Sequence, residues 1–150
     1  MDGYTLEAVL LKDPHAAPYF AGVFASDTLP RTIQQKPALI IVNTDPIKRP
    51  GAHWQAIYLG CYGRGEHFCS YGLGPYVPKI RQFMDLCSLW KKNTIDLQSI
   101  DSAVCGQYCT MYLLFKAHGF SMQEFLSYFT TDCNQNDEMV NKMFQRYAKN

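Results

Sequence analysis

A short aliphatic run, Ala38–Val42 (ALIIV), is the feature that most restricts how this chain can fold. The run is bounded by Pro37 on one side and by Asp45-Pro46 on the other. It is far shorter than the ~20 apolar residues that a membrane-spanning helix needs. A short β-branched run between turn residues instead predicts a buried strand over Ala38–Asn43. We therefore expect a sheet built around this strand and no membrane span.

The composition fits one folded unit. The chain has 150 residues, of which 47% are hydrophobic and only 18% charged, and this balance excludes a disordered chain. Residues 1–150 are therefore expected to form a single domain. The net charge of +1 provides no strong field to select nucleic acid or an anionic membrane. The first residues carry Asp2 and Glu7 without a basic region, so we expect no secretory signal and a protein that stays inside the cell.

The six cysteines are expected to be mostly reduced thiols. An even number in a small chain is typical of disulfide-linked proteins, but such proteins usually carry a secretory signal and a small core. There is no C-x-x-C pair, and the four histidines are scattered, so the sequence predicts no metal site. The cysteines are Cys61, Cys69, Cys87, Cys105, Cys109 and Cys133.

Hydrophobic periodicity and turn residues predict an α+β domain, a small and mainly antiparallel sheet packed against helices. Strands are expected over Ala38–Asn43, Ala52–Leu59 and His67–Tyr71, with a short fourth over Thr94–Leu97. Helices are expected over Leu6–Leu11, Ile80–Leu89, Ser121–Phe129 and Asn136–Tyr147, and from about Val104 to a stop at Gly119. Ser121 and Glu124 fit a capping box, and Asn136 or Asp137 is expected to cap the last helix. The proline-rich stretch 14–37, which holds the aromatic residues Tyr19, Phe20 and Phe24, is expected to be mostly loop.

Three residues could carry chemistry together. Cys105 is predicted at the start of the longest helix, where the helix dipole and free N–H groups favour a thiolate. His53 begins a predicted strand, and an imidazole beside the sulfur would hold the pair as thiolate and imidazolium. Gln98 and the amides at the helix start could bind the oxyanion of an acyl intermediate. Taken alone, however, each residue equally suits a structural role: Cys105 as a small core residue, His53 as a hydrogen-bonded strand-end histidine.

Longer stretches of the chain resemble a known family. Ala38–Leu59 (ALIIVNTDPIKRPGAHWQAIYL), Pro18–Gly22 (PYFAG) and Gln98 followed by Cys105–Cys109 (CGQYC) are similar to the adenovirus protease (adenain) family. Related proteases occur in large DNA transposons and small DNA viruses, within the ubiquitin-like-protease superfamily. The resemblance covers roughly two-thirds of the chain, from about Pro18 to the helix after Cys105.

The resemblance implies a cysteine endopeptidase with a papain-like site in permuted chain order. Cys105 would be the nucleophile, His53 the general base and then general acid, and Gln98 an oxyanion donor, supported by Trp54 and Gly106. The implied substrate is an extended polypeptide with small residues near the scissile bond, in a viral or transposon-encoded precursor. The implied location is the host nucleus or the virion.

The resemblance also bears on cofactors and partners. No cofactor is expected, but the family uses an activating peptide, disulfide-linked to a non-catalytic cysteine, and DNA. Cys61, Cys87 or Cys133 could host such a peptide, and no spacing singles one out. The basic pairs Lys48-Arg49 and Lys91-Lys92 offer only weak support for DNA binding, given the net charge of +1.

One position departs from the family. The family supplies an Asp or Glu as the third catalytic member just before an aromatic-Gly turn, and here that turn is Ser70-Tyr71-Gly72, preceded by Cys69. A thiol orients an imidazole only weakly. Four interpretations stay open: a working Cys-His dyad, an acid supplied by Glu66 although strand alternation points it to the opposite face, a different register, or an altered position in a protein that only binds.

The sequence is also compatible with two other functions. A ubiquitin-like-protein isopeptidase shares the same residue order, and a binding module on an inactive protease fold is motivated by Cys69. Cys109, one turn after Cys105, suits either a small core residue or a resolving thiol that protects Cys105 from oxidation. His67 and His118 are expected to be surface or partly buried structural residues.

Overall fold

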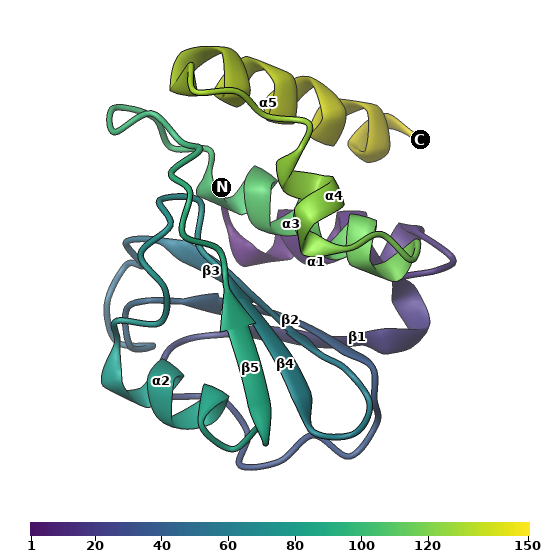
Figure 1. The fold of residues 1–150 in the computed structure, drawn as a ribbon, viewed down its shortest axis with the longest axis vertical. Coiled ribbons are helices and arrows are strands. Elements are labelled where there is room, and N and C mark those ends of the chain that lie inside the picture. Colours follow the sequence, from purple (N-terminus) through teal and green to yellow (C-terminus); the bar gives the residue numbers. More distant parts are fainter.

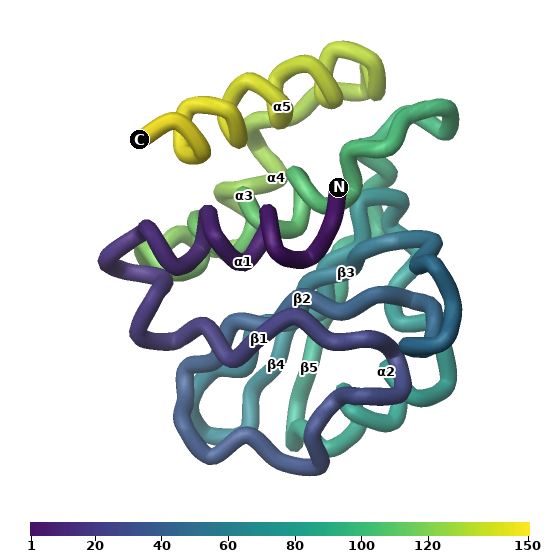
Figure 2. Tube along the Cα trace, turned by 180° about the vertical axis from the view of Figure 1, so that it is seen from behind, coloured from purple at the N-terminus to yellow at the C-terminus, as the bar shows by residue number.

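The computed structural model describes all 150 residues, with five strands in one sheet and helices on both of its faces (Figure 1). Helices α1, α3, α4 and α5 lie over one face, and α2 lies over the other, as the view from behind also shows (Figure 2). The helices are α1 (Gly3–Lys12), η1 (Ala17–Tyr19, a 3₁₀ turn), α2 (Pro78–Met84), α3 (Cys105–Ala117), α4 (Met122–Leu126) and α5 (Cys133–Lys149). The strands are β1 (Phe20–Phe24), β2 (Ala38–Asn43), β3 (Trp54–Leu59), β4 (Arg64–Phe68) and β5 (Leu89–Lys92).

The strands lie in the order in which they follow along the chain, from β1 to β5. The two central pairs, β2 with β3 and β3 with β4, are antiparallel, whereas β1 and β5 run parallel to their neighbours at the two edges. The α+β class is therefore confirmed. The sheet is mixed, whereas a mainly antiparallel sheet was expected. The difference comes from the two parallel edge strands, β1 and β5, which were not predicted at these positions.

Strand β2 is buried along its whole length, as its aliphatic run predicted. Leu39 and Ile41 pack under α1 and α3, while Ile40 and Val42 pack against α2 on the opposite face. Burying each such side chain contributes about 1.5–3 kcal/mol. The strand thus joins two apolar layers, one on each side of the sheet.

Helix α3 occupies the centre of the larger layer. Its first ten residues, Cys105 to Leu114, are all buried between the sheet, α1 and α5. The predicted helix start is confirmed, and so is the stop, since Gly119 adopts the left-handed backbone (φ 90°) that ends helices. A helix enclosed on all sides holds the residue at its first position firmly.

Two strand predictions were wrong. The stretch after Pro18, expected to be loop, contains β1, which pairs with β2. The fourth strand lies at Leu89–Lys92 and not at Thr94–Leu97, because α2 ends at Met84 and the backbone N–H groups of Ser88 and Leu89 donate to the Gly63 carbonyl. This turn brings β5 alongside β4.

Several boundaries also differ from their predictions: α2 and α4 end earlier, at Met84 and Leu126. Strand β4 covers Arg64–Phe68, earlier than expected, so Cys69 follows the strand and does not lie within it. Helix α5 begins at Cys133 with Asp132 as its cap, because Asn136 is fully buried and donates to the carbonyls of Leu97 and Thr130. By contrast, the Ser121/Glu124 capping box is present as predicted.

None of the helices has the length and apolarity that crossing a membrane requires.

Candidate active site

Cys105 is the first residue of α3 and lies at the floor of a cleft of about 500 Å³. Its N-cap, Val104, offers no side-chain acceptor to the first N–H groups of the helix. The Cys105 sulfur instead accepts a hydrogen bond from the backbone N–H of Trp54, at 3.4 Å. Sheet and helix are thus joined at the sulfur itself.

His53 directly precedes β3, whose first residue, Trp54, donates its backbone N–H to the Cys105 sulfur. The His53 backbone is fixed by the Thr44 N–H, which donates to the His53 carbonyl at 2.9 Å. The preceding loop is closed by Asn43, whose Oδ1 accepts from the N–H groups of Asp45 and Ala52. His53 and Cys105 both line the cleft, although no hydrogen bond joins them in this structure.

The two nitrogens of His53 have different surroundings. Nε2 lies 3.5 Å from the Cys69 sulfur, and the ring packs at 5.1 Å (between centroids) on Tyr71. No hydrogen-bond partner of Nδ1 lies within the protein, so Nδ1 is the nitrogen without a competing partner. The Cys69 thiol therefore occupies the position beside the imidazole at which the family resemblance implied an acid.

Cys69 is itself held in place by one side chain. Asn93 accepts from the Cys69 N–H at 3.0 Å and donates to the Cys69 carbonyl at 2.7 Å. Both residues are buried. The two hydrogen bonds fix the backbone of Cys69, and this positions its sulfur next to His53.

The electrostatics of the site favour neutral groups. Burial lowers the pKa of His53 to about 4. Burial also raises the pKa of the Cys105 thiol, and the N–H groups of Trp54 and Gly106 only partly oppose this. Both shifts favour the neutral forms, a thiol and a neutral imidazole, over the thiolate–imidazolium pair that the sequence suggested.

Gln98 lines the cleft but is already hydrogen-bonded on both ends of its amide. Its Oε1 accepts from the Ser70 hydroxyl, and its Nε2 lies 3.0 Å from the Ser102 carbonyl and 3.1 Å from the Ser102 hydroxyl. Acting on an oxyanion would require one N–H to leave Ser102. The helix-start amides of Cys105 and Gly106 have no such competitor among side-chain caps.

Gly106 lies where no larger residue fits easily. A Cβ atom there would lie 3.0 Å from Leu6 Cδ2 and 3.2 Å from Trp54 Cδ1. The absence of a side chain thus lets α1 and the Trp54 ring approach the start of α3 closely. Trp54 is further fixed through its indole N–H, which donates to the Met1 carbonyl at 3.0 Å.

Several other candidate residues lie away from this chemistry. Glu66 points to the α3 side of the sheet, where it accepts from the Tyr112 hydroxyl and pairs with Lys116 at 3.1 Å, so it does not supply the missing acid. Cys109 is fully buried in the core, as a small core residue would be. His118 is exposed, and its Nε2 lies 2.8 Å from Oδ2 of the buried Asp13. No group of three or more His, Cys, Asp or Glu side chains is arranged to bind a metal.

The prediction for His67 was wrong. Its side chain is fully buried on the α2 side of β4, where Nε2 lies 2.8 Å from Oε1 of Gln55, also buried. Burial lowers its pKa to about 3. The sequence does not predict that His67 is buried, because its one polar partner, Gln55, lies on another strand.

Comparison with solved structures supports the fold. The central domain of the uncharacterized Lpg1148 protein from Legionella pneumophila matches with a TM-score of 0.57 at 14% identity, over 99% of this chain and 96% of that one. The ASFV pS273R protease, in a selenomethionine crystal structure, matches with a TM-score of 0.43 at 23% identity, over 68% of this chain. This chain spans only 43% of the length of that protease. Neither protein-family models nor curated proteins give a match to the sequence.

Several residues that shape the cleft were not predicted as site residues. Tyr71, Leu73, Tyr76 and Ser102 line it, and Asn93 and Ser102 form hydrogen bonds with Cys69 and Gln98, respectively. Tyr71 was named only as part of a turn. Single asparagines and serines in loops give no signal, because their role depends on contacts between segments that lie far apart in sequence.

Proposed function

We propose that the protein is a cysteine endopeptidase in which Cys105 attacks a peptide carbonyl and His53 transfers the proton. The observation that carries this proposal is the position of Cys105: a thiol at an uncapped helix start, in an open cleft that it shares with a histidine. The resemblance of the sequence to the adenovirus protease family supports the same roles.

The neutral resting pair suggests how the first step proceeds. Nδ1 of the neutral His53 ring accepts the thiol proton while the sulfur forms a bond to the carbonyl carbon. The carbonyl oxygen becomes an oxyanion and is stabilised by the N–H groups at the start of α3. His53 then gives the proton to the leaving amine, and water releases the acyl group from the sulfur by the same route in reverse.

The shape of the cleft favours an extended polypeptide substrate. Its walls carry Trp54 and the aromatic residues Tyr71 and Tyr76, which leave room for small side chains beside the sulfur. By resemblance, the substrates are precursor proteins of a virus or a DNA transposon, and the protein acts in the host nucleus or the virion. An activating peptide and DNA remain proposals of the same kind.

The test is covalent labelling by a peptide vinyl sulfone at pH 7, followed by mass spectrometry of the intact protein. Because Cys61 is exposed and reacts with many reagents, the experiment uses a Cys61→Ser background. We expect one label per molecule and none after Cys105→Ala, with Cys87→Ala as a control that keeps the label. Labelling that persists in Cys105→Ala would show that another thiol is the reactive one.

A second candidate is a ubiquitin-like-protein isopeptidase, which the same residue order supports. A substrate ending in Gly-Gly on a ubiquitin-like protein distinguishes the two activities, because a processing protease would cleave short extended peptides equally well. If neither substrate is cleaved and neither the natural chain nor Cys69→Asp is labelled, the fold serves as a binding module.

A further inference from the structure

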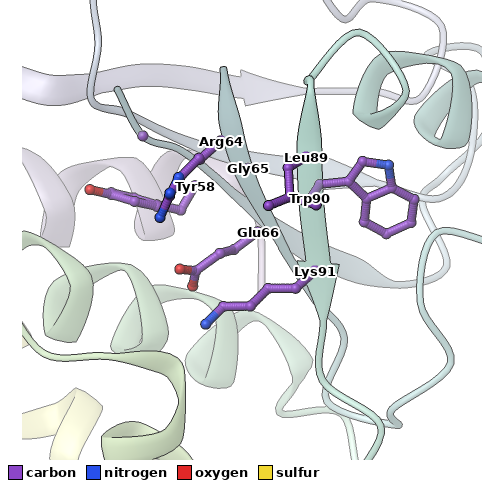
Figure 3. Close-up of a pocket in the computed structure, with 8 residues that line it drawn as sticks. Tyr58, Arg64, Gly65, Glu66, Leu89, Trp90 and Lys91 are labelled. Carbon is purple, nitrogen blue, oxygen red and sulfur yellow. The ribbon is translucent and has the colours of Figure 1, made fainter. Parts of the chain in front are cut away.

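A second hollow lies at the opposite end of the sheet from Cys105. It has a volume of about 260 Å³ and is lined by the ends of β3, β4 and β5. The register places Arg64 opposite Leu89 and Glu66 opposite Lys91, so these four side chains share the α3 face of the sheet. Figure 3 shows Tyr58, Glu66 and Lys91 on the same side, with Trp90 directed to the other side of β5.

The hollow exists because the helical layer is shorter than the sheet. Helix α3 ends at Ala117, and its last basic residue, Lys116, closes one side of the hollow by lying 4.6 Å from the centre of the Tyr58 ring. Helix α2 meets β5 on the opposite face, through Trp90, and β5 is also an edge strand with a neighbour on one side only. The backbone of β5 is therefore free to pair with another strand.

The charge around the hollow is strongly unbalanced. Glu66 is its only acid, and Lys116 neutralises it at 3.1 Å in a pair that is mostly buried. Arg64 and Lys91 take part in none of the three ion pairs of the structure. A neighbouring hollow of about 270 Å³ shares Arg64 with this one. Its lining adds Arg31 and Lys36 and contains no acidic residue.

Apolar side chains are exposed between these charges. Leu89 is 65% exposed, Leu86 68% and Tyr62, at the β3–β4 turn, 95%. The hollow itself is smaller than the roughly 300–1,000 Å³ of a small-molecule site, but it suits one or two side chains. Exposed apolar side chains next to cations without an ion-pair partner are complementary to a peptide that carries both acidic and large apolar residues.

We propose that this end of the sheet, centred on Arg64 and Lys91, binds an acidic, partly apolar peptide segment of a partner protein in an extended conformation beside β5. The exposed apolar side chains favour a protein segment over nucleic acid, because a charged phosphate backbone makes no favourable contact with Leu86 and Leu89. This surface is separate from the cleft of Cys105, and the proposal holds whether or not the protein is a protease.

The experiment measures fluorescence anisotropy of labelled heptapeptides with the Cys105→Ala protein, which cannot cleave them. The first peptide alternates acids with Leu and Phe (Glu-Leu-Asp-Phe-Glu-Leu-Asp). In the others, the acids become Gln and Asn, the acids become Lys, or the apolar residues become Ser. We expect only the first peptide to bind, and its affinity to fall as salt is raised.

The matched variants separate a local site from overall charge. Arg64→Glu with Lys91→Glu should weaken binding at least about tenfold. Lys142→Glu with Arg146→Glu, the same change at exposed cations of α5, should alter it less than about twofold. If the Arg64→Glu, Lys91→Glu variant does not fold, the variant Arg64→Gln with Lys91→Gln replaces it in the same binding measurement.

Three results would overturn the proposal: equal binding of the neutral or Lys-containing peptides, equal loss in both double variants, or no binding of any peptide. Displacement of the peptide by single-stranded oligothymidylate, with no requirement for apolar residues, would assign the surface to nucleic acid.

Discussion

The sulfur of Cys69 lies 3.5 Å from Nε2 of His53, so the side chain that orients the candidate catalytic histidine is a thiol. A neutral thiol cannot hold an imidazolium as a carboxylate does. This explains why burial alone sets the pKa of His53, which lies at about 4 with no opposing contribution from an acid.

Replacing Cys69 by Asp should make the site more active. A carboxylate beside Nε2 would raise the pKa of His53 and stabilise the imidazolium that forms during attack, and we expect turnover to rise at least about tenfold. Peptide hydrolysis measures this, with Cys69→Asn as the control of similar size and no charge. If Cys69→Asp is folded and no faster than Cys69→Asn, then His53 is not the proton carrier.

The pH dependence of activity should reflect the low pKa of His53. His53 accepts a proton only when neutral, so kcat/KM should stay high on acidification until pH approaches about 4. Initial rates over a pH series, with tryptophan fluorescence to follow the folded fraction, give the profile. An acid limb near pH 6.5 would mean that His53 is solvated during catalysis. In Cys69→Asp the limb should move to higher pH.

Stability should fall in acid because of His67. This histidine is buried with a pKa of about 3, while the unfolded chain has the ordinary value of 6.5. Below pH 6.5 the unfolded state binds a proton that the folded state does not, so the free energy of unfolding falls, by roughly 2 kcal/mol at pH 5. Urea unfolding at pH 7.5 and pH 5 should show a smaller pH effect in His67→Gln. The exposed His15→Gln variant should keep the full effect.

Gln98 offers a test of oxyanion binding. If one of its N–H groups leaves Ser102 to contact the oxyanion, Gln98→Ala should lower kcat about 10²-fold or more with little change in KM. Ser102→Ala removes a competing acceptor, the hydroxyl at 3.1 Å, and should not lower kcat. Equal losses of activity and stability in both variants would show that the pair is structural only.

Gly106 should tolerate no side chain without moving the nucleophile. In Gly106→Ala the new methyl group meets Leu6 and Trp54 at 3.0–3.2 Å, which shifts the start of α3. We expect a loss of about 1–3 kcal/mol of stability and a larger loss of activity than of labelling at exposed Cys61. Gly119→Ala provides a control for stability, because nothing lies within 4 Å of that position and only its positive φ is strained.

The strongly periodic and aliphatic parts of the chain were predicted well, and the contacts between them were not. Strand β2, the start of α3 and the Ser121 capping box follow from local patterns. Strand β5 could not be predicted, because its four residues form a strand only by pairing with β4. The roles of Cys105, His53 and Gln98 stay predictions. The pKa shifts of Cys105 and His53 come from burial, which no spacing in the sequence reports.

The enclosure of α3 has a consequence for how the thiol responds to stress. Since the apolar residues of α3 from Tyr108 to Leu114 belong to the main hydrophobic core, they can be freed only when the whole domain opens. Amide hydrogens along this part of the helix should exchange as slowly as any in the molecule, and denaturant should expose Cys109 to thiol reagents only at the midpoint of global unfolding. Cys105, which lines the cleft, should be reached by the same reagents before unfolding, so the two thiols of one helix report on different events.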